Sequence, residues 1–141
     1  MKKSMMWAGV AALLLGLPGC GGKQVDSAVL EGNHWVLSTM NGAEAGTLFS
    51  EQMPTIDFNF TDSTVYGYSG CNRFTGGFRL VDGKLQAPHM ASTRMACPDM
   101  EHEDEFLSVF AGEGAVLSLE KGDMLKLENE GIVLTFASQA K

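Results

Sequence analysis

Apolar and polar residues alternate along much of this chain, and that pattern limits what it can fold into. Residues 56–60 read Ile-Asp-Phe-Asn-Phe, so every second side chain is apolar. Successive side chains of a β-strand point to opposite faces, so this pattern predicts a strand with one buried face. Alternating or apolar-aromatic runs of similar length recur at 34–40, 65–68, 78–81, 84–87, 115–119, 125–127 and 132–136. We therefore expect a mainly antiparallel β domain.

Short turn sequences separate several of these segments. Asp82-Gly83 joins two of them, and Asp-Gly is one of the strongest hairpin signals because both residues tolerate positive φ. Residues 121–123 and 129–131 form similarly short connections near the C-terminus. These turns predict a hairpin over 78–87 and an antiparallel meander of the last three strands.

One segment, which follows Pro98, has the pattern of an amphipathic helix. Proline suits the first helical turn, and the acidic residues after it suit the positive end of the helix dipole. Phe106, Val109 and Phe110 are spaced i, i+3 and i+4, which predicts a stripe that faces a core. The expected solvent-facing residues are Glu103, Asp104 and Ser108. With this helix the fold class is α+β.

The first 19 residues have the pattern of an export signal. Lys2 and Lys3 precede the uncharged, mostly apolar segment 5–17, which is too short to span a bilayer. Leu17-Pro18-Gly19-Cys20 resembles the bacterial lipobox, although Pro18 departs from the usual small residue. We therefore expect a lipoprotein signal peptide over 1–19 and lipid attachment at Cys20.

Lipidation would divide the chain into an anchored tether, residues 20–29, and a folded domain, residues 30–138. Two or more acyl chains hold a protein on a membrane stably without a membrane-spanning segment. Gly21 follows the lipobox cysteine where an aspartate would favour inner-membrane retention in enteric bacteria. The expected location is therefore the outer membrane, with the domain facing the periplasm.

The charge of the chain argues against nucleic-acid binding. The formal net charge is −7, and loss of both lysines with the signal peptide would make it −9. Phosphate backbones are bound by clustered Lys and Arg, and no stretch here gathers more than two basic residues. The remaining partners to expect are the membrane, an unknown envelope protein or a small ligand.

The chain has three cysteines, of which the lipobox accounts for Cys20. Cys71 and Cys97 remain, and an even pair in an exported protein is most simply a disulfide. Such a bridge would close a loop of 27 residues and stabilise the fold by roughly 3 to 4 kcal/mol. A redox or nucleophilic thiol, for example one paired with His89 or His102, stays open because such partners meet only in the folded chain.

Two further patterns lead to no cofactor or metal prediction. The glycine-rich stretch 67–77 lacks the Gly-Lys-Ser/Thr ending of a phosphate loop and leads into a strand-like segment. His102 and Glu105 could bind a metal at i, i+3, but no second His or Cys lies at ligand spacing. Such an acidic cluster is more typical of a solvated helix face.

The sequence around the two cysteines is similar to the META domain family. The residues that carry the resemblance are Trp35, 70–74 (Gly-Cys-Asn-Arg-Phe), Leu85, 91–97 (Ala-Ser-Thr-Arg-Met-Ala-Cys), Phe106 and 125–127. The resemblance covers roughly residues 30–137. It implies a small envelope domain with a curved antiparallel sheet, or a partly open barrel, and one covering helix. It also implies stress tolerance and, in some bacteria, novobiocin resistance, but no established catalytic residue.

The candidate recognition surface lies beside the glycines and comprises Tyr66, Tyr68, Asn72 and Arg73. Aromatic residues in a strand also pack against neighbours, and Asn72 could instead satisfy backbone groups in a turn. A bridge from Cys71 to Cys97 would then pin this turn to the base of the helix.

We accordingly expect a non-enzymatic envelope lipoprotein with a binding or stress-tolerance role. The alternative in another class is an inhibitor of an exported protease or lysozyme, because a charge of −9 would attract a basic partner. A thiol-dependent enzyme is the third possibility, and it competes directly with the disulfide.

Overall fold

The structure is a computed structural model that describes residues 25–121 and 123–141. The expected signal peptide, residues 1–19, and the expected lipid site at Cys20 lie outside the described residues. In the described part of the chain, no helix is both long and apolar enough to cross a membrane.

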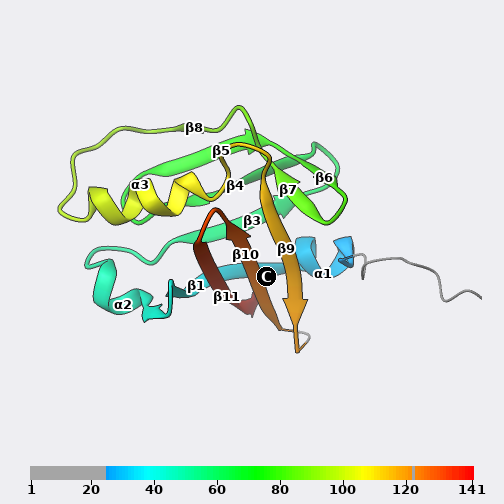
Figure 1. Cartoon of the computed structure of the whole chain (residues 1–141), viewed down its shortest axis with the longest axis horizontal. Helices are drawn as coiled ribbons and strands as arrows, with labels where there is room; N and C mark the ends of the chain where they lie inside the picture. The colour runs from blue at the N-terminus through cyan, green and yellow to red at the C-terminus, as the bar shows by residue number, and fades with distance from the viewer. Residues whose placement is uncertain (1–24, 122) are drawn as a thin grey trace, which may run out of the picture.

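A single antiparallel sheet forms most of the domain and curves into a half-barrel. In the sheet the order is β6-β7-β9-β10-β11-β1-β3-β4-β5-β8, and β2 pairs with β1. The strands are β1 (Asn33–Met40), β2 (Ala43–Glu44), β3 (Thr55–Asn59), β4 (Thr64–Tyr68), β5 (Arg73–Gly77), β6 (Arg79–Val81), β7 (Lys84–Gln86), β8 (Ala91–Ser92), β9 (Ala115–Glu120), β10 (Met124–Asn129) and β11 (Ile132–Ala140). The helices are α1 (Ser27–Gly32), α2 (Ala45–Leu48) and α3 (Met100–Ser108) (Figure 1). The expected fold class is confirmed.

The structure has turns at the predicted positions 82–83 and 130–131. Asp82 and Gly83 both have positive φ, as a type I′ turn requires, and they join β6 to β7. Glu130 and Gly131 make the same kind of turn between β10 and β11. The antiparallel pairs β9–β10 and β10–β11 confirm the C-terminal meander.

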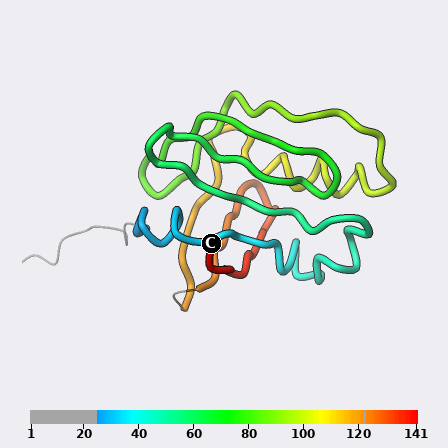
Figure 2. Tube along the Cα trace, turned by 180° about the vertical axis from the view of Figure 1, so that it is seen from behind, coloured from blue at the N-terminus to red at the C-terminus, as the bar shows by residue number. Residues whose placement is uncertain are grey.

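The core lies between α3 and the concave side of the sheet. Helix α3 ends at Ser108, so only Phe106 of the predicted stripe lies in the helix, while Val109 and Phe110 lie in the turn after it. The Phe106 and Phe110 rings contact Phe74 of β5, with ring centroids 6.0 and 5.7 Å apart. Phe106 also lies 6.1 Å from Phe136 of β11. Val109, the third residue of the predicted stripe, is fully buried. Figure 1 shows α3 running across one side of β4 and β5, and in Figure 2, from behind, those strands lie in front of the helix.

The folded domain begins slightly earlier and ends slightly later than predicted. Helix α1 starts at Ser27, inside the expected tether, because Leu30 is buried and its carbonyl accepts the Trp35 indole N–H at 3.0 Å. At the other end, β11 continues to Ala140, where it pairs with Asn33. Within the glycine-rich stretch 67–77, residues 73–77 form strand β5.

Candidate functional site

A buried acid at the start of α3 organises the site. Glu103 is only 4 % exposed, so the expectation that it faces water is wrong. One carboxylate oxygen accepts the backbone N–H groups of Cys71 and Asn72, both at 3.0 Å, and the other accepts the Asn72 amide at 2.5 Å. A buried carboxylate needs such donors, and here they come from the turn that precedes β5.

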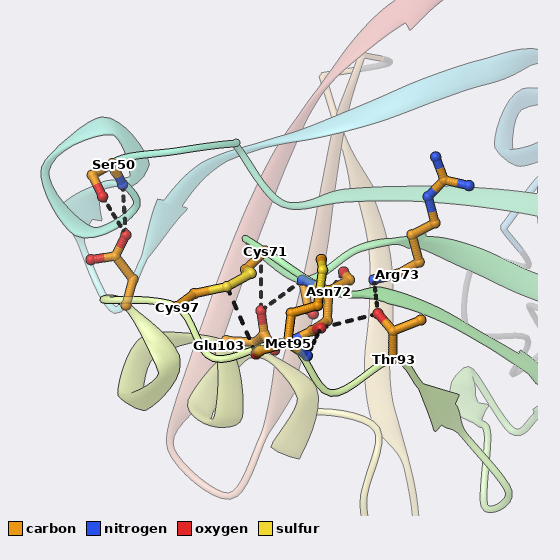
Figure 3. Close-up of a disulfide and its surroundings, with 10 residues drawn as sticks. Ser50, Cys71, Asn72, Arg73, Thr93, Met95, Cys97 and Glu103 are labelled. Carbon is orange, nitrogen blue, oxygen red and sulfur yellow. Dashed lines mark hydrogen bonds between the residues drawn. A yellow bond between two sulfur atoms is a disulfide. The ribbon is translucent and has the colours of Figure 1, made fainter.

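Asn72 is the centre of this network. Its Oδ1 accepts the Met95 backbone N–H at 2.7 Å and the Thr93 hydroxyl at 3.0 Å, while Nδ2 also donates to the Met95 carbonyl. Asn72 is 1 % exposed, so the prediction that it belongs to the recognition surface is wrong. The other reading, that it satisfies backbone groups, agrees with these bonds (Figure 3).

The two cysteines lie at the end of the same network. In the structure Cys71 and Cys97 are joined by a disulfide, and their Cα atoms are 6.3 Å apart. The bridge connects the turn before β5 to the segment that leads into α3 (Figure 3). Asp99 lies two residues after Cys97, and its carboxylate accepts hydrogen bonds from the backbone N–H and the hydroxyl of Ser50. These bonds hold the pKa of the Asp99 carboxyl below its usual value.

The face of the sheet opposite the core presents two rows of cross-strand neighbours. Val65 and Phe74 point into the core, so the residues on either side of each point outward. Antiparallel pairing places Asp57, Tyr66, Thr75 and Ala91 in one row across β3, β4, β5 and β8. The second row contains Tyr68, Arg73 and Thr93.

These rows line an open hollow of about 610 Å³. Tyr66, Tyr68 and Arg73 all lie in its wall, so three of the four residues of the predicted surface come together there. The Arg73 guanidinium stacks over the Tyr68 ring, 5.2 Å from its centroid. Figure 3 shows this side chain pointing away from Glu103 and its partners.

A hydrogen-bonded pair of side chains that the sequence did not reveal, His34 and Asp57, lies at the other end of the hollow. His34 Nδ1 lies 3.0 and 2.9 Å from the two carboxylate oxygens of Asp57, and Lys141 Nζ is 3.8 Å from one of them. The available signal was alternation: His34 and Asp57 both occupy outward positions of their strands, which are neighbours in the sheet. The sequence does not show that β1 and β3 are adjacent.

The other candidate ligands are separated from one another. His102 packs against the Phe49 ring, with centroids 6.1 Å apart, whereas Glu105 accepts a hydrogen bond from Asn41. Glu51 lies close to the sulfurs of both cysteines, but these sulfurs are bonded to each other in the structure. His89, in the loop before β8, is exposed.

Gly67 in β4 allows β4 to lie close to β3 beside the hollow. A Cβ on this residue would lie 2.1 Å from the Thr55 carbonyl oxygen, so alanine here would push β4 away from β3. We expect Gly67→Ala to lower the free energy of unfolding by about 2 kcal/mol in chemical denaturation. Gly77→Ala is the control because its Cβ would meet nothing nearer than 3.8 Å. Equal stability of the two variants would contradict this account of Gly67.

Comparison with known proteins agrees with this architecture. The META domain model matches residues 28–141, and the chain belongs to the META domain family. The "Heat shock protein HslJ" of Escherichia coli (strain K12) is 30 % identical over 121 residues, which cover 84 % of each chain.

Two solved structures share the fold. One, described as "NMR structure of the protein", has a TM-score of 0.66 and 30 % identity, and the match covers 81 % of this chain and 95 % of that one. The other, an NMR structure of a protein from Burkholderia xenovorans, has a TM-score of 0.64 and 25 % identity over 89 % of this chain and 98 % of that one.

Proposed function

We propose that this protein is a non-enzymatic binding module of the cell envelope and that the hollow beside Tyr66, Tyr68 and Arg73 holds its ligand. The lipid on Cys20 would anchor it at the outer membrane, facing the periplasm. A role in stress tolerance fits the family and the heat-shock designation of the E. coli relative.

The hollow is the observation that carries this proposal. Its volume of about 610 Å³ lies within the range that small-molecule sites occupy, and few polar groups converge on mostly apolar walls. The alternative of a thiol-dependent enzyme needs a free thiolate, and in the structure Cys71 and Cys97 are bonded to each other. Binding without chemistry therefore accounts for more of the geometry.

A neutral fluorescent probe, N-phenylnaphthylamine, tests whether the hollow accepts an apolar ring. We expect saturable binding to the purified chain, measured as a rise in fluorescence. Tyr66 is 42 % exposed, so Tyr66→Ala should leave the core intact and weaken binding roughly fivefold through loss of ring contact.

The matched control is Val116→Ala, which removes an exposed apolar side chain on β9, outside the hollow. This variant should bind the probe as the unchanged chain does. Failure of the probe to saturate, or equal weakening by both substitutions, would overturn the assignment of the hollow as a binding site.

A further inference from the structure

Arg73 is the cationic group of the hollow that keeps its donors available. Within residues 25–121 and 123–141, no carboxylate forms an ion pair with its guanidinium, which lies over the Tyr68 ring. At the opposite end, Asp57 already interacts with His34 and Lys141. The hollow thus presents one unpaired positive charge, while its own carboxylate is compensated.

The backbone of Arg73 is held firmly. Its N–H donates to the Thr93 hydroxyl and its carbonyl accepts the Thr93 N–H, both at 3.0 Å. The residue before it, Asn72, is fixed by the buried Glu103. A guanidinium that starts from a fixed backbone and lies on an aromatic ring loses less conformational freedom when an anion binds.

Tyr66 lies diagonally across the β4–β5 pair from Arg73, because Tyr66 pairs with Thr75 and Tyr68 pairs with Arg73. Diagonal neighbours in an antiparallel pair are separated by about 7 to 8 Å. This spacing is still within reach of aromatic and long side chains, so a ring compound that covers the Tyr66 ring can bring an acid group close to its ring within reach of Arg73.

We propose that the hollow selects aromatic acids, that is, planar ring compounds that carry a carboxylate or sulfonate close to the ring. This inference rests on the proposed function and adds the chemical class of the ligand. The ring lies against Tyr66, and the acid group receives hydrogen bonds from the Arg73 guanidinium, whose planar fork matches two anionic oxygens. The charge complementarity is local, since the chain as a whole is acidic.

Two probes with the same ring skeleton separate the contribution of the charge from that of the ring. Anilinonaphthalene sulfonate carries an acid group that N-phenylnaphthylamine lacks. We expect the sulfonate to bind the purified chain about tenfold more tightly than the neutral probe. In Arg73→Gln the ratio of the two affinities should fall to about one.

Arg79→Gln provides the matched control, because Arg79 is an exposed cation on β6 that does not line the hollow. It should leave both affinities unchanged, and thermal unfolding should show that both variants are folded. Salt titration of the unchanged chain gives a test without mutation: salt should weaken the sulfonate probe and not the neutral one.

Equal binding of the two probes would overturn the selection for acids and leave the binding site itself standing. Equal losses in Arg73→Gln and Arg79→Gln would likewise overturn it, since total charge would then be responsible. Decyl sulfonate tests the ring: if it displaces the aromatic sulfonate as well as naphthalene sulfonate does, the aromatic selectivity is overturned. Failure of the neutral probe to bind, whatever the sulfonate does, would contradict the proposed function itself.

Discussion

Glu103→Gln is expected to lower the free energy of unfolding by about 3 kcal/mol, because the buried carboxylate accepts three N–H donors. Glutamine has nearly the same shape, but one of its terminal atoms is an NH₂ group that cannot accept. That group would face the N–H donors of Cys71 or Asn72 and leave at least one of them unsatisfied. Urea denaturation of the oxidised chain measures the change.

Asp104→Asn provides the control for this substitution. Asp104 follows Glu103 in α3 and is exposed, so its replacement removes one negative charge from the same helix without a buried partner. Its effect should stay within about 0.5 kcal/mol. If the two variants were equally stable, the carboxylate would not be the organising group that its hydrogen bonds indicate.

Replacing both Cys71 and Cys97 by serine should lower the free energy of unfolding by roughly 3 to 4 kcal/mol, the value that loop closure gives for a 27-residue loop. The bridge restricts the unfolded chain between the turn before β5 and the base of α3. The measurement compares denaturation of the double variant with that of the oxidised protein.

A reducing agent gives an internal check on this prediction. Treatment with dithiothreitol should bring the unchanged chain down to the stability of the double variant and leave that variant unaffected. Mass spectrometry of the unreduced protein should show two fewer thiol hydrogens. Two free thiols in periplasmic material, or one that reacts rapidly with an alkylating agent, would instead favour the thiol-dependent enzyme.

Strands, turns and the helix stripe could be predicted because each is encoded within a few neighbouring residues. Alternation identifies β3 through Ile56 and Phe58, and Asp82-Gly83 identifies a hairpin through the φ angles it tolerates. Tyr66 and Arg73 could be grouped because they lie close together in the sequence. In each case the pattern of neighbouring residues is enough, and the residues that pack against the segment need not be known.

The buried network could not be predicted because its partners are far apart in sequence. The Glu103 carboxylate binds N–H groups 32 and 31 residues earlier, those of Cys71 and Asn72. An acid in the first turn of a helix usually interacts with solvent and the helix dipole, so local reasoning placed Glu103 outside. The pairing of His34 with Asp57 similarly depends on a strand order that the sequence does not encode locally.

The half-barrel leaves both ends of the sheet open, and this affects how copies of the protein behave when concentrated. Unpaired backbone groups on an edge strand can recruit strands from other molecules. Here the two edge strands are short, three residues in β6 and two in β8, and β6 begins with the exposed Arg79. These two strands therefore offer a neighbour few hydrogen-bonding positions, and they give little opportunity for strand-mediated aggregation when the domain is crowded on a surface.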